Sequence, residues 1–292
     1  MTANVMVVDD HSRLAHRSVT ARLRGRGWIV WAVVIGFIVL CAIFPSAMSP
    51  YSYTKQKAAE RFLAPMSTSS RGLHVFGTDE LGRDVLSKVI AGARLTLFIG
   101  LMSTLIGATI GVTLGMIAGF RGGFVDRLVM RLTEAQTAMP MFLLALLLIS
   151  VVGASVWNLI LILPTYVWPT FARLIRAETM RMRSSPFIEA AVALGCKQRT
   201  VLWRHLFPNL WPRVAVLSAI SVGQVILAEA GLSFIGAGVQ TPDVTWGLLI
   251  SGGRKYLSVA WWPTVFPGIF AGMTVFALNG LARRFGEVRG LR

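Results

Sequence analysis

Long runs without charged residues constrain the fold of this chain more than any other feature of its sequence. Residues 135–172 carry no charged side chain, and neither does the run Trp28–Met48. Such runs are typical of membrane-spanning helices, which need about 20 consecutive apolar residues to cross the hydrocarbon core. Charged residues are only 14% of the 292 residues, whereas a soluble domain usually carries about a quarter. The sequence therefore predicts an integral membrane protein.

The apolar runs divide into six spans, which predicts an all-α polytopic fold. The expected spans are residues 28–48, 95–119, two helices within 135–172, 214–235 and 263–282. The run 135–172 is too long for one span, and the segment 153–158, with its Gly, Ser and Asn, marks the turn between two. An amphipathic helix is expected before it, over Phe124–Glu134, and Glu229 interrupts the fifth span. A signal peptide is the alternative for 28–48, but its apolar region would be about 7–15 residues long.

The distribution of Lys and Arg predicts the orientation of the chain in the membrane. Twenty of the 29 basic residues lie in four segments that six spans place on one side: the N-terminus, 120–134, 173–213 and the C-terminal tail. Basic residues are enriched on the cytoplasmic side of membrane proteins. We therefore expect both termini, residues 1–27 and 285–292, in the cytoplasm and the loop 49–94 outside. The net charge of +16 then reflects orientation, and nucleic-acid binding is not expected.

The second expected span has a small residue at every fourth position. Ser103, Gly107, Gly111, Gly115 and Gly119 follow one another in this spacing. Small residues four apart share one helix face and let a second helix backbone approach closely. Glycine is also tolerated in membrane helices without such a role, but five small residues in register favour a packing face.

Motifs for catalysis, nucleotide binding and metal binding are absent from the sequence. It contains no Gly-x4-Gly-Lys-Ser/Thr loop for a nucleotide and no His-Glu-x-x-His motif or Cys/His cluster for zinc. Cys41 and Cys196 give no disulfide framework. An enzyme is therefore not expected, and the energy for uphill transport must come from an ion gradient or from another subunit.

Glu229 is the clearest ionisable residue within an expected span. Ion-coupled carriers use ionisable groups inside the membrane, so Glu229 is a candidate proton or substrate site. It has no evident Lys, Arg or His partner in its run and lies toward the outer end of the span. A carboxylate that anchors the neighbouring loop is favoured. A stand-alone ion-coupled carrier remains the alternative from a different functional class.

The basic segment after the long uncharged run begins with a short helix. Ser184 or Ser185 can cap this helix, and Pro186 suits its first turn. Glu189 then lies near the positive end of the helix dipole. Gly195 can take the left-handed conformation that ends a helix.

A second short helix is expected over Lys197–Leu206, with Pro208 as its stop. A thin helix followed by a sharp break can bind in a groove on a partner protein. It can equally be an amphipathic connector that lies among the lipid headgroups.

The same segment resembles the EAA loop of ABC importer permeases, whose usual form is EAA-x3-G-x9-I-x-L-P. The matching positions are Glu189, Ala190, Ala191, Gly195 and Pro208. His205 replaces the Ile, as is common in the peptide-importer branch, and Phe207 replaces the Leu.

A second segment, 77–85, is similar to the GTDxxGRDV sequence of C-type permeases of dipeptide and oligopeptide importers. Its matching residues are Gly77, Thr78, Asp79, Gly82, Arg83 and Asp84. Further similar segments are 92–94, 122–123, 229–236 and 245–247, so the resemblance covers roughly residues 75–280 in the family's order. The C-terminal sequence 279–284 departs from the acidic ending that is usual in the family.

The resemblance implies a type I ABC importer permease with a five-helix core over 95–284 and a cytoplasmic coupling loop over 178–212. It implies that peptides cross the cell membrane through the interface of two permeases, with membrane lipid around them. The expected partners are a B-type permease, two ATPase subunits that bind ATP and Mg²⁺, and an extracytoplasmic peptide-binding protein. No cofactor is expected on this chain. A permease for nickel or another small solute of the same family is the alternative.

Overall fold

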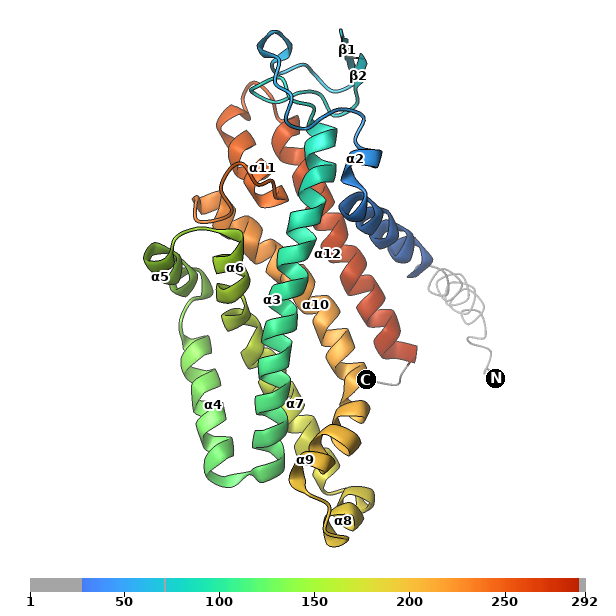
Figure 1. The fold of residues 1–292 in the computed structure, drawn as a ribbon, viewed down its shortest axis with the longest axis vertical. Coiled ribbons are helices and arrows are strands. Elements are labelled where there is room, and N and C mark those ends of the chain that lie inside the picture. Colours follow the sequence, from blue (N-terminus) through green and yellow to red (C-terminus); the bar gives the residue numbers. More distant parts are fainter. Residues whose placement is uncertain (1–27, 71, 289–292) are drawn as a thin grey trace, which may run out of the picture.

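The computed structural model describes residues 28–70 and 72–288 of the chain as an elongated bundle of helices. A β-hairpin lies at one end of the long axis and the short helix α8 at the other (Figure 1). The expected cytoplasmic segment 1–27 and the last residues of the tail, 289–292, lie outside the described residues.

Within the described part of the chain, four helical runs are long and apolar enough to cross a membrane. They are α3 (Val85–Arg121), α6 (Val156–Ile162) with α7 (Pro164–Arg183), α9 (Gln198–Thr200) continued by a π-helical turn (Val201–Leu206) and α10 (Phe207–Ile235), and α12 (Trp262–Val288). The predicted all-α membrane fold is therefore confirmed.

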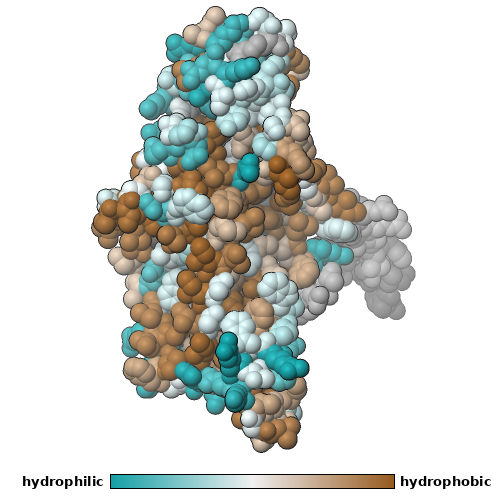
Figure 2. All heavy atoms as spheres, in the orientation of Figure 1, coloured by the Kyte–Doolittle hydropathy of each residue, from teal (hydrophilic) through white to brown (hydrophobic). Residues whose placement is uncertain are grey.

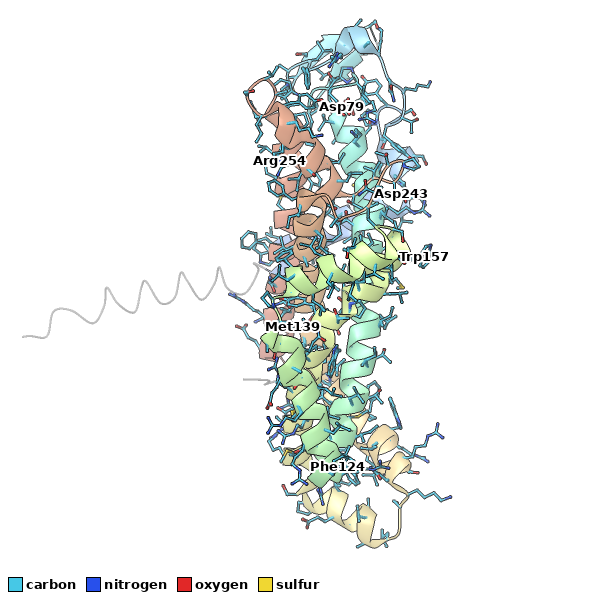
Figure 3. The ribbon with its side chains drawn as sticks, turned by 90° about the vertical axis from the view of Figure 1, so that its left-hand side faces the viewer. Asp79, Phe124, Met139, Trp157, Asp243 and Arg254 are labelled. Carbon is cyan, nitrogen blue, oxygen red and sulfur yellow. The ribbon has the colours of Figure 1, made fainter. Side chains whose placement is uncertain are left out.

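The predicted number of six spans is not reached by length and composition. Helices α4 (Gly123–Ala138) and α5 (Met141–Val152) meet at 88°, so together they form a fifth, broken span or a re-entrant segment. Figure 3 shows α4 running from Phe124 to Met139, where the chain bends into α5. The shorter apolar helix Trp28–Ile43 is the remaining candidate.

Two predicted element boundaries are wrong in the first half of the chain. The helix that begins the described chain ends at Ile43, because Pro45 interrupts the backbone hydrogen bonds and starts the short helix α2 (Pro45–Met48). The second span begins at Val85 rather than at residue 95, because the Asp84 side chain accepts the backbone N–H of Ser87 and caps the helix.

The expected loops also contain regular structure. The segment before α3 holds a short 3₁₀ turn (Ala58–Glu60) and the antiparallel strands β1 (Ser67–Ser69) and β2 (Gly72–His74), in which Thr68 pairs with Leu73. The expected loop 236–262 holds α11 (Trp246–Gly253) and a second 3₁₀ turn (Arg254–Tyr256). Helix α12 continues past the predicted end at residue 282, so residues 285–288 of the expected tail are helical.

The predicted turn within the uncharged run is confirmed. Gly153 has a φ of 84°, and the Ser155 hydroxyl accepts the N–H of Asn158 to cap α6. The amphipathic helix expected over Phe124–Glu134 is α4, which is longer at both ends.

The centre of the bundle is formed by α3 against α7. A side-chain carbon added at Gly107 would meet Val167 at 2.7 Å, and one at Gly115 or Gly119 would meet a backbone carbonyl of α7 at 2.6 Å. A side-chain carbon added at Gly111 would likewise come too close to Trp168 and Phe171 of α7. The four glycines therefore let the two helix backbones approach closely.

The surface reflects the membrane setting of the bundle. Figure 2 shows hydrophilic residues gathered toward the two ends of the long axis and hydrophobic residues along the sides between them. The tip that α8 forms carries hydrophobic residues again (Figure 2).

Candidate functional site

Helix α8 (Pro186–Ala193) joins α7 to the α9–α10 run at the end of the bundle opposite the β-hairpin (Figure 1). Pro186 occupies its first turn, as predicted. Ile188, which is 1% exposed, and Ala191 pack into the bundle. The remaining side chains face outward, and Phe187 and Leu194 are 54% and 85% exposed.

The start of α8 is not capped by a serine side chain, so that prediction is wrong. The Ser185 hydroxyl donates to the carbonyl of Met182 at 2.6 Å, and the Ser184 hydroxyl donates to that of Arg181 at 3.1 Å. Both hydroxyls donate to carbonyl groups in the last turn of α7, and the Met182 carbonyl also accepts the N–H of Ser185 at 3.0 Å. The two serine side chains therefore bind the end of α7, whereas the sequence predicted that one of them caps the start of α8.

The end of α8 has the geometry of a Schellman motif. Gly195 has a φ of 80° and donates its N–H to the carbonyl of Val192 at 2.9 Å. Cys196 donates its N–H to the carbonyl of Ala191 at 3.1 Å. A glycine takes this left-handed conformation without the steric cost that other residues meet. The sharp break that follows Glu189, Ala190 and Ala191 thus depends on Gly195.

Pro208 does not stop a helix, contrary to the prediction. It lies in the first turn of α10, where a missing N–H is tolerated, and the helical run continues from Gln198 to Ile235. The π-helical turn Val201–Leu206 precedes it. The side-chain amide of Asn209 donates to the carbonyl of His205 at 2.7 Å.

The near end of α3 lies next to α8, and residues that flank α8 contact it. A cleft of about 660 Å³ separates them, with Gly119 and Phe120 on one wall and Ile188 and Glu189 on the other. The guanidinium of Arg183 lies 5.8 Å from the ring centre of Phe120. The end of α3 is thus joined to the end of α7, the helix that leads into α8.

A hydrogen bond also joins the segment after α8 to α3. Arg121 Nε donates to Gln198 Oε1 at 3.0 Å. The ring of Phe187 meets that of His205 edge to face, with 5.3 Å between centres. The α8 segment is thus held at both flanks while its outer face stays open.

The segment 77–84 forms a compact, charged turn at the opposite end of the molecule. The carboxylate of Asp79 accepts the backbone N–H groups of Leu81 and Arg83, each at 2.9 Å. It also accepts hydrogen bonds from Arg83 Nε and Lys88 Nζ, each at 2.7 Å. Burial opposes ionisation of Asp79, but the charge and hydrogen bond of Lys88 and the contacts of Arg83 outweigh it and lower the pKa of Asp79.

Glycine and threonine give this turn its shape. Gly77 and Gly82 have φ values of 72° and 69°, which only glycine adopts readily. The Thr78 hydroxyl accepts the N–H of Leu63 at 2.8 Å and donates to the carbonyl of Glu60. The turn is thereby fixed to the chain that precedes the β-hairpin.

Asp84 connects this turn to the hairpin and to α3. One carboxylate oxygen caps α3 through Ser87, and the other lies 2.8 Å from Nδ1 of His74. Nε2 of the same histidine lies 3.0 Å from the hydroxyl of Ser69. All six residues of the predicted motif, Gly77 to Asp84, therefore lie together at the start of α3.

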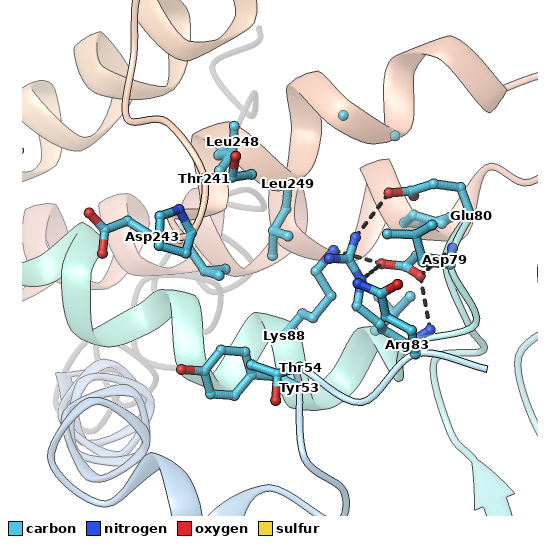
Figure 4. Close-up of a pocket in the computed structure, with 18 residues that line it drawn as sticks. Tyr53, Thr54, Asp79, Glu80, Arg83, Lys88, Thr241, Asp243, Leu248 and Leu249 are labelled. Atoms are coloured by element: carbon cyan, nitrogen blue, oxygen red, sulfur yellow. Dashed lines mark hydrogen bonds and ion pairs between the residues drawn. The ribbon is translucent and has the colours of Figure 1, made fainter. Parts of the chain in front are cut away.

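The charged turn borders a cleft of about 490 Å³, shown in Figure 4. The segment 53–56 and the loop 241–244 with α11 form its other walls. Asp243 lies at the end of the cleft away from Asp79, Glu80 and Arg83 (Figure 4).

Glu229 is buried within α10 and does not interrupt that helix, contrary to the prediction. Its Oε1 accepts hydrogen bonds from Ser233 at 2.8 Å and from Thr245 at 2.9 Å. The Thr245 hydroxyl in turn accepts the N–H of Leu248 and caps α11. The carboxylate thus connects α10 to α11, a helix that sequence reasoning missed although Thr245 is a good cap residue.

The fold is similar to that of a known transporter. Solved inward-facing structures of the MetNI methionine ABC transporter include a chain that aligns with 71% of this chain and 97% of its own length, with a TM-score of 0.58. Its sequence identity of 18% supports the fold alone.

Sequence comparisons identify the family. A family model described as the inner membrane component of binding-protein-dependent transport systems matches residues 111–287. The oligopeptide transport system permease protein OppC of Haemophilus influenzae is 31% identical, over 88% of this chain and 81% of its own length. The dipeptide transport system permease protein DppC of Bacillus subtilis is 34% identical, over 85% and 76%. The glutathione transport system permease protein GsiD of Escherichia coli O157:H7 is 34% identical, over 85% and 80%. The chain therefore belongs to the family of inner membrane components of binding-protein-dependent transport systems.

Proposed function

We propose that this multi-pass membrane protein is a permease subunit of an ABC importer that moves peptides into the cytoplasm. Three relatives that cover most of the chain are named as permeases for oligopeptides, dipeptides and glutathione. The family consists of membrane components and not of enzymes, so the energy comes from separate subunits.

In the complete importer, this chain contacts three kinds of protein subunit and the membrane lipid. A homologous B-type permease pairs with it, two ATPase subunits bind ATP and Mg²⁺ in the cytoplasm, and a peptide-binding protein docks outside. Membrane lipid surrounds the bundle. The excess of Lys and Arg in the N-terminal segment, in 120–134, in 173–213 and in the tail supports a cytoplasmic position for both termini and α8.

The observation that carries this proposal is the open outer face of α8. A short helix that exposes Phe187 and Leu194 at a hydrophilic end of the bundle has the form of a docking element for a groove. Ile188 and Ala191 fix it to the bundle. We assign Glu189, Ala190, Ala191 and Gly195 to coupling with an ATPase subunit, and Pro208 to the join between this loop and α10.

Two alternatives have less support. In the described residues, no group of three or more His, Cys, Asp or Glu side chains is placed to hold a metal ion, so a nickel permease has no site to support it. The hydrogen bonds that Oε1 of Glu229 accepts from Ser233 and Thr245 support a structural carboxylate that joins α10 to α11, although its Oε2 is buried without a hydrogen-bond partner among the described residues.

Purification of the complex from its native membrane tests the proposal. With an affinity tag on this chain, mass spectrometry is expected to identify a second permease in an amount equal to that of this chain. It is also expected to identify ATPase subunits that total twice that amount. ATP-dependent uptake of a dipeptide by the reconstituted complex completes the test. A chain that purifies alone, or a complex that accumulates nickel and no peptide, would contradict the proposal.

A further inference from the structure

A groove of about 630 Å³ runs along the outside of the bundle near the charged turn. It is bordered by the helix Trp28–Ile43, by α3 and by the loop 242–244. It shares Tyr53 and Asp243 with the cleft of Figure 4, so the two hollows meet at these residues. The groove has a charged upper rim and an apolar floor.

Two charges on this rim lack an ion partner among the described residues. In the two hollows together, Asp79 and Glu80 are paired with Arg83, and Asp79 also binds Lys88. The remaining charged residues are Arg94 on α3 and Asp243 on the loop. No hydrogen bond or ion pair within the described chain engages either one, and they are not paired with each other. A ligand that binds both must carry a negative and a positive group.

The position of Arg94 along α3 corresponds to a membrane surface. Arg94 and Arg121 are separated by 27 residues of one continuous helix, which is about 40 Å. That distance is close to the thickness of a bilayer with its headgroups, about 40–45 Å. With Arg121 at one headgroup layer, Arg94 lies at the other. Tyr53 on the same rim is of the aromatic type that is enriched at this depth.

Below the rim, apolar side chains continue toward the membrane centre. Phe98 and Leu101 follow Arg94 on the same face of α3, and Val39 and Ile43 face them from the first described helix. These four side chains are between 38% and 58% exposed in the chain. A charged rim above an apolar floor is the shape of a binding site for a lipid headgroup and its acyl chain.

We propose that this groove binds one phospholipid with a primary ammonium headgroup. Arg94 binds the phosphate, Asp243 binds the ammonium group, and an acyl chain lies against Phe98, Leu101, Val39 and Ile43. A peptide also carries both charges, but the long apolar floor at membrane depth favours a lipid. The orientation in the proposed function makes this a lipid of the outer leaflet, and the chemistry of the site is independent of the transported solute.

The test uses the intact complex in lipid nanodiscs and counts retained phospholipid by native mass spectrometry. Three bilayers serve as probes: phosphatidylethanolamine, phosphatidylcholine and phosphatidylglycerol. We expect about tenfold stronger retention of phosphatidylethanolamine than of phosphatidylcholine, because a quaternary ammonium cannot donate a hydrogen bond to Asp243. Phosphatidylglycerol, which has no ammonium group, is expected to bind as weakly as phosphatidylcholine.

Two substitutions separate the two contacts. Asp243→Asn is expected to remove the preference for phosphatidylethanolamine, and Arg94→Gln to weaken retention of all three lipids, whereas Arg94→Lys keeps it. Arg254→Gln is the matched control, because Arg254 stacks on Phe234 outside the groove. Equal retention of the three lipids, or displacement of the bound lipid by a free dipeptide, would overturn the proposal. The amount of assembled complex, measured in parallel, identifies a variant that merely fails to fold.

Discussion

At the scale of single residues, Gly195 sets the shape of the turn after α8, the segment that we propose couples to an ATPase subunit. Its φ of 80° is far from the value of about −65° that proline requires. Gly195→Pro is therefore expected to destroy the turn after α8 and abolish ATP-driven peptide uptake, while the chain still inserts. Gly195→Ala places a side chain in the left-handed conformation, which costs about 1 kcal/mol of conformational free energy. This variant is therefore expected to retain part of the uptake.

Uptake by vesicles and the amount of chain in the membrane are the two quantities to compare. Gly272→Ala is the matched control, because Gly272 lies in α12 without a positive φ or a neighbour near its Cβ position. Normal uptake by the Gly195→Pro variant at normal expression would show that this turn is not needed for coupling.

Glu189 offers a second test on the outer face of α8. Glu189→Lys places a positive charge in the first turn of the helix, where the dipole favours a negative one, and on the surface assigned to docking. We expect uptake to fall at least about tenfold with unchanged expression, which corresponds to about 1.4 kcal/mol of lost coupling. Glu134→Lys on α4 is the control, because Glu134 forms only an exposed pair with Arg131. Equal effects of both changes would refute a specific role for Glu189.

Asp79 makes the stability of the charged turn depend on pH. Its folded-state pKa is below the ordinary value of 3.8, so its stabilising effect is present above about pH 4 and is lost as the pH falls through the folded-state pKa. Asp79→Asn is expected to destabilise the turn by about 2 kcal/mol at neutral pH. Thermal unfolding temperatures of the variant and the wild-type complex should therefore converge as the pH falls through the lowered folded-state pKa of Asp79. A difference that is independent of pH would contradict ionisation of Asp79 as the cause.

At the scale of elements, the contact between α3 and α7 depends on small residues. A side-chain carbon at Gly111 would meet Cβ of Phe171 at 2.6 Å and the backbone N of Ala172 at 3.1 Å. Gly111→Leu therefore separates two helices along their whole contact, which costs about 3 kcal/mol or more. We expect a clear loss of assembled complex in size-exclusion chromatography. Gly272→Leu is the control, and an unchanged yield of complex for Gly111→Leu would argue against this helix contact.

The centres of the spans could be predicted from the sequence, whereas several of their ends could not. Uncharged runs locate α3, α10 and α12 because membrane depth permits little else. The start of α3 was misplaced because Lys88 and Arg94 make its first turns resemble a loop. In the structure Lys88 is neutralised by Asp79, a contact with a residue that only the folded turn brings near.

The site was predictable to a similar degree. Pro186 in the first turn of α8 and the left-handed Gly195 follow from local backbone chemistry. The role of Ser185 and the continuation of the helix through Pro208 depend on neighbouring turns, which the sequence pattern does not reveal. Helix α11 was missed because it is short and its cap, Thr245, is held by Glu229 from another helix.

At the scale of the whole molecule, α3 connects the two ends that carry the family motifs. It has 37 residues, which corresponds to about 55 Å. Asp84 fixes its first turn to the charged segment, and Arg121 joins its last turn to the segment after α8. Because α7 packs along it through the glycines, the two helices form one unit. A displacement of α8 is therefore expected to reach the opposite end of the bundle.

In the proposed importer, this chain provides a path and a coupling helix but no source of energy. Concentrative dipeptide uptake into proteoliposomes tests it most directly, with the chain alone, with its partner permease, and with the complete importer and ATP. We expect accumulation against a gradient only in the complete, ATP-supplied importer, and its loss in the Glu189→Lys complex. Accumulation by the chain alone, driven by an ion gradient, would contradict it.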